Sequence, residues 1–240
     1  MSTLTPRVQY PSSDGQPMAD NTLQFQWIVT LQGNLDIAYR GDPTVFVAGD
    51  HLIYPLEDDT IRQAPDVYVA FGRPKGHRGS YAVAEEGGIF PQVIFEVWSP
   101  GNRQQAMEDK REFYEKYGAE EYYIVYPEFP SHVDAWRAVD GAFVRVEDIA
   151  AWRSPRLGIR FEIRRGKLTV YHADGRRFLS HVELGEFAER ETERADQEHE
   201  RAEAEAKRAE QQQQQAAREK ARADKLAEKL RKLGLDPDAE

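Results

Sequence analysis

The segment QVIFEVWSPGN, residues 92–102, places a single carboxylate among apolar side chains. Hydrophobic residues on both sides of Glu96 indicate a strand over residues 92–98 that is buried on both faces. An ionised carboxylate in such a strand costs on the order of several kcal/mol unless another charge or a set of hydrogen bonds compensates it. Glu96 therefore requires a compensating partner from another part of the chain.

Two further charged residues stand at positions where the surrounding pattern is apolar. Asp66 begins the run DVYVAF, which predicts a strand over residues 66–71. Lys110 lies in the inward stripe of a helix predicted to follow Asn102, at three- and four-residue spacing from the stripe's apolar members. Those members are Ala106, Met107, Phe113, Tyr114 and Tyr117. Two carboxylates and one ammonium group that point inward from separate elements compensate one another only where they converge.

Convergence of Asp66, Glu96 and Lys110 suits the hydrolysis of a phosphodiester. Mg²⁺ prefers carboxylate oxygens and keeps several of its waters, so Asp66 and Glu96 can hold it while a substrate phosphate completes its shell. Mn²⁺ is an expected substitute. The ion polarises the phosphate and acidifies a bound water. Lys110 then orients or deprotonates that water, or neutralises the charge that develops on the phosphate.

Each of the three residues also has a purely structural explanation. Asp66 follows Pro65 and can serve as a turn or cap at the start of its strand. Glu96 and Lys110 can form a buried ion pair that has no role in catalysis. The combination is harder to explain in this way than any single residue, because three charged side chains would have to enter the core for separate reasons.

At these residues the sequence resembles the Uma2 family of endonucleases, within the PD-(D/E)XK nuclease superfamily. The resemblance rests on Pro65-Asp66, on the run FEVWSP and on Lys110, and it covers roughly residues 14–187. Supporting positions are Phe113, Tyr114, Gly118, Glu121, Tyr122, Tyr123 and Pro127. The resemblance implies a restriction-endonuclease-like core, in which a mixed central β-sheet is flanked by helices, with Mg²⁺ at the active site. It carries metal binding onto Asp66 and Glu96, and the role of the catalytic lysine onto Lys110.

One position departs from the superfamily pattern. The lysine of that pattern lies two residues after the acidic residue, where this chain has Trp98. Proteins of the Uma2 type place the lysine on the following helix, which is the position that Lys110 occupies. The resemblance thus supports Glu96 more directly than Lys110, and a degenerate member that does not cleave is an alternative.

The order of the predicted elements favours an α/β (α+β) class. A strand over residues 92–98, a helix from residue 102 to about residue 117 and a strand over residues 122–126 form a crossover unit. Asn102 is expected to cap that helix, with Gln105 completing a capping box, and Gly118 is expected to end the helix.

The remaining elements are expected on both sides of this unit. A helix is predicted over residues 22–38, with Asp20 or Asn21 as its cap. Turn dipeptides at Asp140-Gly141 and Arg165-Gly166 predict hairpins. The hairpins are expected over residues 132–146 and 159–171, and further short strands over residues 44–48 and 51–54.

Composition divides the chain into three parts. Residues 1–20 are polar and rich in Pro, Ser and Asp, and we expect them to be flexible. Residues 21–185 hold all four tryptophans and form the predicted nuclease-like domain. Residues 186–240 consist mostly of Ala, Glu, Arg, Lys and Gln, which favours a long charged C-terminal α-helix.

The predicted tail helix carries a thin apolar seam. Alanine recurs every seven residues from Ala195 to Ala223, but the complementary heptad position is polar until Leu226 and Leu233. A stable coiled coil requires large apolar residues at both positions. We therefore expect a solvated, coiled-coil-prone helix that pairs weakly. Other restriction-like nucleases often act as dimers, and by this analogy of fold alone we expect a homodimer through this helix.

Composition also excludes several classes of protein. The chain has no cysteine, so disulfides and thiolate metal sites are absent, which fits a reducing compartment. No apolar run is long enough to span a bilayer, and the N-terminus lacks the pattern of a signal peptide, so we expect a cytoplasmic protein with no membrane partner. The net charge of −10 is unlike that of a protein that coats nucleic acid, although a local basic groove is compatible with it.

Other candidate residues carry weaker signals. Asp50 can act as an additional acidic group near Asp66, but a turn residue is the simpler explanation. The Gly-rich loop over residues 72–81 offers Arg73, Lys75 and Arg78 as phosphate contacts, and a solvated hairpin tip explains it equally well. The chain has neither a Walker pattern nor a G-x-S-x-G elbow, so the sequence does not support a nucleotide triphosphatase or a serine hydrolase.

The sequence thus predicts a Mg²⁺-dependent endonuclease that hydrolyses phosphodiester bonds of DNA, with Asp66, Glu96 and Lys110 as its catalytic residues. The alternative is a catalytically inactive nuclease relative that works as an interaction or adaptor protein through its C-terminal helix. Wide separation of the three side chains would favour the adaptor, whereas their convergence would favour the enzyme.

Overall fold

The computed structural model of the chain describes residues 10–13, 15 and 17–232, and the side chain of Leu230 is excepted. The predictions that fall on residues 1–9, 14, 16 and 233–240 lie outside the described residues. The chain forms two compact units, Met1–Glu183 and Leu184–Glu240.

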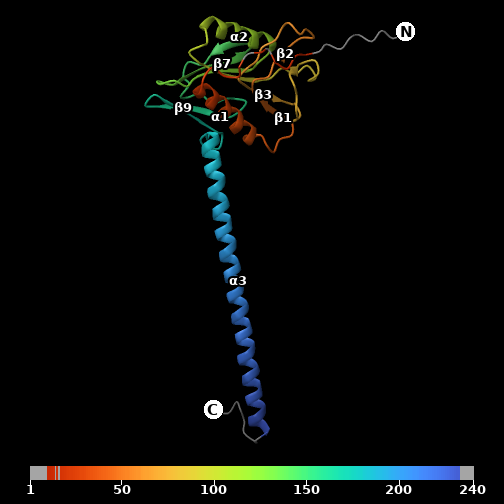
Figure 1. Cartoon of the computed structure of the whole chain (residues 1–240), viewed down its shortest axis with the longest axis vertical. Coiled ribbons are helices and arrows are strands. Elements are labelled where there is room, and N and C mark those ends of the chain that lie inside the picture. Colours follow the sequence, from red (N-terminus) through yellow and green to blue (C-terminus); the bar gives the residue numbers. More distant parts are fainter. Residues whose placement is uncertain (1–9, 14, 16, 233–240) are drawn as a thin grey trace, which may run out of the picture. The chain divides into compact units, whose positions relative to one another are not determined.

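The first unit is built around a six-stranded mixed sheet with the strand order β1-β3-β5-β6-β7-β8 (Figure 1). Its strands are β1 (Val45–Ala48), β3 (Val67–Phe71), β5 (Val93–Val97), β6 (Glu121–Tyr126), β7 (His132–Val139) and β8 (Ala142–Arg145). Strands β5 and β6 run parallel and are joined by the crossover helix α2 (Gln104–Tyr117), whereas the other neighbouring pairs of this sheet are antiparallel. The expected mixed central sheet with flanking helices is therefore confirmed.

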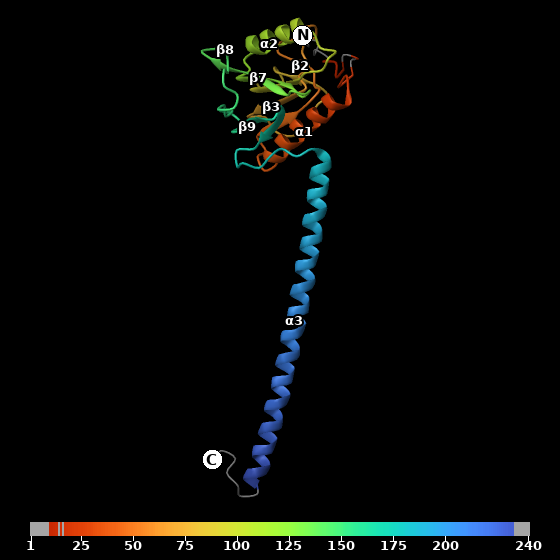
Figure 2. The same cartoon turned by 90° about the vertical axis from the view of Figure 1, so that its left-hand side faces the viewer.

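Helix α1 (Thr22–Ala38) covers one face of the sheet, the face opposite α2 (Figure 2). The helix buries Ile28, Leu31 and Leu35 in a cluster that includes Phe95 and Val97 of β5. A hairpin of β9 (Arg160–Arg164) and β10 (Lys167–Tyr171) adds further side chains to this layer. These are Phe161, Leu168 and Val170.

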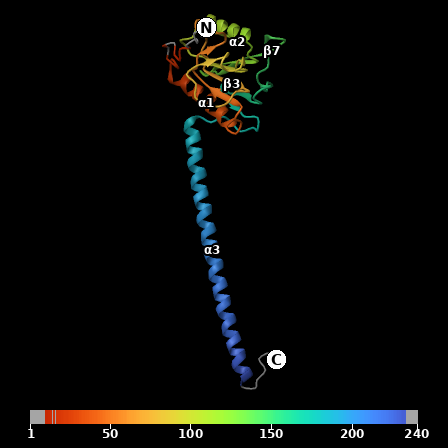
Figure 3. The same cartoon turned by 90° about the vertical axis from the view of Figure 1, so that its right-hand side faces the viewer.

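Helix α2 covers the other face (Figure 3). Met107 and Tyr114 of the helix pack in a cluster with Ile94 of β5 and Ile124 of β6. Because side chains alternate along a strand, Glu96 projects toward the same side as Ile94. A small parallel sheet of β2 (Ile53–Tyr54) and β4 (Tyr81–Ala82) borders this layer.

Helix α1 and the two hairpins follow the sequence closely. The α1 bounds are those predicted, and Asn21 caps the helix because its Oδ1 accepts a hydrogen bond from the backbone N–H of Gln24 at 2.9 Å. The predicted turns are confirmed at residues 140–141 and 165–166, where all four residues adopt positive φ. This left-handed pair of conformations matches the twist of the flanking strands.

The predicted cap of α2 is wrong. Arg103 occupies the N-cap position and makes no side-chain capping bond. The Asn102 side chain instead accepts a hydrogen bond from the backbone N–H of Ser99 at 2.7 Å, so it stabilises the loop before the helix rather than the helix itself. The predicted end is confirmed, because Gly118 adopts φ 97° at the C-cap.

The described part of the N-terminal segment is bonded to the rest of the first unit. Tyr54 OH donates to the carbonyl of Pro11 at 2.8 Å, and Ser99 Oγ donates to Asp20 Oδ2 at 2.5 Å. Residues near position 20 are thereby connected to the loop that follows β5.

The second unit consists, over its described residues, of the helix α3 (His181–Lys232) from Leu184 onward. Its side chains from residue 185 to residue 226 are exposed, as expected for a solvated helix. Ion pairs one turn apart, such as Arg194 with Glu198, support it. None of the helices has, within the described residues, a stretch long and apolar enough to cross a bilayer.

We expect alanine at two glycines to change the free energy of unfolding in opposite directions. Gly118 has φ 97°, where a Cβ costs about 1–2 kcal/mol. Gly33 lies inside α1 with nothing within 4 Å of an added Cβ, so alanine there gains about 0.5–1 kcal/mol. Denaturant unfolding of Gly118→Ala and Gly33→Ala measures both changes, and effects of the same sign would contradict the assigned conformations.

Candidate active site

Glu96 is enclosed between the sheet and α2. Its side chain is 1% exposed, and both of its oxygens have protein partners. Tyr114 OH donates to Oε1 at 2.8 Å, and Lys110 Nζ donates to Oε2 at 2.7 Å. The two partners lie one turn apart on α2. The crossover helix therefore supplies the compensation that the buried strand requires.

Lys110 lies between the buried Glu96 carboxylate and an adjoining cavity. Its side chain is 20% exposed, and Nζ also donates to the carbonyl of Ala64 at 3.3 Å. Ala64 lies two residues before Asp66, so the lysine connects α2 with the segment that enters β3. Lys110 of α2 thus contacts Glu96, and its role as the catalytic lysine stays a prediction.

Asp66 lies opposite Glu96 when the antiparallel register of β3 and β5 is extended by one residue. Its Oδ2 accepts a hydrogen bond from the backbone N–H of Val97 at 2.6 Å. Burial, and then the nearby Glu96 carboxylate, raise the pKa of Asp66 to about 8, although Lys110 acts in the opposite direction. The structure therefore brings the three predicted residues together as two carboxyl groups and one ammonium group.

The cavity beside this cluster has a volume of about 270 Å³. Its wall carries the side chains of Asp20, Asp50, Asp66 and Lys110, so that acidic residues outnumber basic ones by three to one. A cleft lined by one sign of charge with low-dielectric walls concentrates its electrostatic potential. Because the pKa of Asp66 is raised to about 8, this group is mostly protonated near pH 7, and a cation bound beside it would favour its ionised form.

The carboxyl groups near the cavity are of the type that Mg²⁺ or Mn²⁺ prefers. Asp66 lines the cavity, whereas Glu96 lies behind the wall with its two oxygens bonded to Tyr114 and Lys110. Mg²⁺ is usually bound through one or two carboxylates together with waters and substrate phosphates, so Asp66 is the carboxyl group open to an ion in this structure. Within the part of the chain that the structure describes, no group of three or more His, Cys, Asp or Glu residues is arranged to hold a metal ion. The described residues thus offer no closed zinc site with four protein ligands, and metal binding by Asp66 and Glu96 stays a prediction.

Two residues that support the cluster were not selected for function from the sequence. Gln24 of α1 is buried, and its Nε2 donates to the carbonyl of Val97 at 2.8 Å while its Oε1 accepts from the backbone N–H of Asp20. A polar residue on the apolar face of a predicted helix is the signal that could have identified Gln24. Tyr114 was assigned to an apolar stripe, and no sequence signal distinguishes its hydroxyl bond to Glu96 from simple packing.

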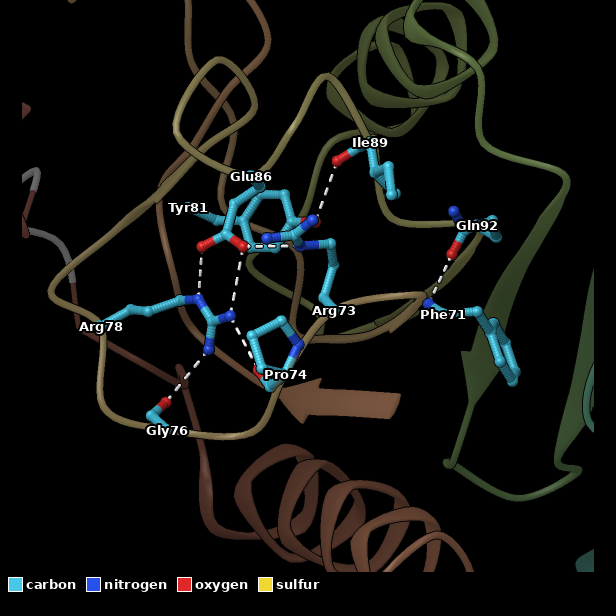
Figure 4. A network of polar contacts seen from close by, with 9 residues as sticks. All are labelled: Phe71, Arg73, Pro74, Gly76, Arg78, Tyr81, Glu86, Ile89 and Gln92. Carbon is cyan, nitrogen blue, oxygen red and sulfur yellow. Dashed lines mark hydrogen bonds and ion pairs between the residues drawn. The ribbon is translucent and has the colours of Figure 1, made fainter. Parts of the chain in front are cut away.

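The Gly-rich basic loop is closed by an internal ion-pair network (Figure 4). Arg78 Nε donates to Glu86 Oε1 at 2.5 Å, and Arg73 Nε donates to Glu86 Oε2 at 2.9 Å. Burial tends to raise the pKa of Glu86, but the bonds from Arg78 and Arg73 outweigh it and hold this pKa below its usual value. Both guanidinium groups expected to contact phosphate thus bind a carboxylate of the chain, and their role toward phosphate stays a prediction.

The other two weaker candidates are placed as follows. Lys75 Nζ lies 3.4 Å from Asp36 Oδ1 in a largely exposed pair, so its phosphate contact also stays a prediction. Asp50 has φ 52°, and its backbone N–H donates to the carbonyl of Pro65 at 3.1 Å, as expected of a turn residue. Its side chain also lines the acidic cavity, where its charge acts on Asp66.

The sheet and the cluster together define a class of protein. A mixed sheet with two carboxylates at its centre, approached by a lysine from the crossover helix, is the core expected of a restriction-endonuclease-like nuclease. The profile of the Uma2 family, described as "Putative restriction endonuclease", matches residues 6–191. Because this match spans well over half of the 240 residues, the chain belongs to the Uma2 family, as the resemblance implied. It is thereby assigned to a family of nucleases.

Comparison with solved structures gives a more distant similarity. The chain is similar to a crystal structure described as "a putative nuclease belonging to DUF820" from Anabaena variabilis. The two are 14% identical, the match covers 62% of this chain and 77% of that chain, and the TM-score is 0.43. A similarity at this level carries no separate conclusion. No curated protein matches the chain.

We expect the stability of the metal-free protein to depend on pH through Asp66. Its folded pKa of about 8 lies above the ordinary value of 3.8, so between these values the folded state binds more protons than the unfolded chain. Stability contributed by this group therefore falls as the pH rises from 4 to 8. In the parent, the free energy of unfolding should fall by up to a few kcal/mol over this pH range, and in Asp66→Asn this fall should be absent. Denaturant unfolding in chelator at several pH values measures the difference, and identical pH slopes would contradict the assignment.

We also expect the Glu96–Lys110 pair to be strongly coupled. Lys110→Met leaves an ionised carboxylate in the core and should lower the free energy of unfolding by about 3–5 kcal/mol. The double variant Glu96→Gln/Lys110→Met should lose less than the sum of the two single variants, because neither charge is then left alone. Chemical denaturation of all four proteins measures this coupling. Additive losses would show that the two side chains do not interact.

Proposed function

We propose that the protein is a Mg²⁺-dependent endonuclease that hydrolyses phosphodiester bonds of DNA, with Mn²⁺ as a substitute ion. Membership in the Uma2 family supports action on nucleic acid. The carboxyl groups of Asp20, Asp50 and Asp66 at the cavity wall support a cation site there. A divalent cation bound there would favour the ionised form of Asp66 and add positive charge that attracts a polyanionic substrate.

The proposed roles follow from the contacts. Asp66 and Glu96 would hold the ion, which polarises a phosphate and acidifies a bound water when present. Lys110 stabilises the ionised form of Glu96 inside the core, and its charge at the cavity wall favours the negative charge that develops on the phosphate during attack. Tyr114 binds the second oxygen of Glu96 and thereby limits rotation of the carboxylate.

The experiment is the nicking of supercoiled plasmid DNA by the full chain with Mg²⁺ or Mn²⁺. We expect Asp66→Asn, Glu96→Gln and Lys110→Met each to lower the cleavage rate by at least about 100-fold, because each removes charge from the reacting centre. Glu121→Gln is the matched control. Glu121 is also buried in the sheet, but its carboxylate bonds to Tyr123 OH and lies outside the cluster.

Thermal unfolding of each variant verifies that it is folded. Equal nicking by the parent and all variants would assign the cleavage to a contaminant and contradict the proposal. A parent that cleaves neither plasmid, single-stranded DNA nor RNA with either ion would support the adaptor alternative instead.

A further inference from the structure

Charge is unevenly distributed along α3. Residues 186–210 carry ten acidic and five basic side chains, a net charge of −5. Residues 211–232 carry three acidic and seven basic side chains, a net charge of +4. The boundary falls at the uncharged run Gln211–Gln215. The helix therefore presents an acidic half followed by a basic half.

A row of small side chains marks one face of the same helix. Its members follow one another at seven-residue intervals: Ala188, Ala195, Ala202, Ala209, Ala216 and Ala223. On a straight helix a seven-residue repeat drifts by about 20° per heptad, and it stays in one contact only when two helices wind around each other. Alanine permits close approach but buries little apolar area, so the row alone would hold a pair weakly.

Charge decides which orientation strengthens that contact. In a parallel pair the acidic halves face each other and the basic halves face each other, whereas an antiparallel pair places each half against its opposite. Packed helix axes lie about 8–10 Å apart, which is about one Debye length at physiological salt. Screening between facing side chains is therefore incomplete, and the antiparallel arrangement is favoured.

The charge pattern and the alanine row share a midpoint. An antiparallel pair with its twofold axis between Gln212 and Gln213 aligns Ala209 with Ala216 of the second copy. The same axis aligns Ala202 with Ala223 of the second copy. It also passes through the boundary between the acidic and basic halves, so that glutamines face glutamines where the charge changes sign.

We propose that α3 pairs in antiparallel orientation with α3 of a second copy of this chain. A second copy uses the acidic half, the basic half and the alanine row together, whereas a nucleic acid would use the basic half alone. Each helix begins at its own globular unit, so the two globular units of the pair lie near opposite ends of it. This pairing does not depend on the proposed nuclease activity.

The absence of cysteine allows a direct test of orientation on the full chain. Ala202→Cys and Ala223→Cys are prepared separately, one with a mass tag, mixed, and equilibrated in glutathione redox buffer. We expect the mixed disulfide to exceed either homodisulfide at least about tenfold, because the antiparallel pair aligns position 202 with position 223. The matched control is the pair Glu200→Cys and Lys225→Cys, which lies at the same level but on the far face and should not cross-link preferentially.

Sedimentation equilibrium of the unmodified chain gives the second measurement. The dimer dissociation constant should rise several-fold between low and high salt, because the attraction is electrostatic. Homodisulfides in excess over the mixed disulfide would show parallel pairing and overturn the proposal. A chain that is monomeric at every salt concentration would also overturn the proposal. This holds equally if the basic half of α3 is then found to bind duplex DNA.

Discussion

The core of the first unit must compensate one carboxylate that is buried away from water. Glu96 sits in a central strand, so its partners must come from an element that covers the same face. The crossover from β5 to a parallel β6 returns through α2 and places Lys110 and Tyr114 over that face. A tight antiparallel hairpin after β5 would have placed no helix there. The parallel step of the sheet and the candidate site therefore have a common origin.

Much of this arrangement could be predicted from the sequence, for two physical reasons. The bounds of α1 and the two hairpins depend on local chemistry, namely the Asn21 cap and residues able to adopt positive φ at the turns. The convergence of Asp66, Glu96 and Lys110 follows from the cost of burying charge, which no local structure can offset. Membership in the Uma2 family then agrees with the prediction of a nuclease-like protein.

The features that could not be predicted are those in which tertiary packing decides which of several similar polar groups forms a given hydrogen bond. Asn102 and Arg103 compete for the start of α2, and the bond of Asn102 to the loop at Ser99 decides the outcome. Glu86 belongs to a polar turn, and its pairing with two arginines depends on how residues 72–86 fold back on themselves. Gln24 likewise acquires its partner at Val97 only when α1 packs on the sheet.

The Glu86 network has a consequence for how this loop could meet an external ligand. Its carboxylate already occupies the place of an anion between Arg73 and Arg78. A phosphate arriving from solution must compete with a tethered group whose effective concentration is high. Exchange of this one glutamate for a neutral residue would leave both guanidinium groups without this carboxylate partner. The availability of these two arginines to an external phosphate thus depends on one acidic residue and not on the number of arginines in the loop.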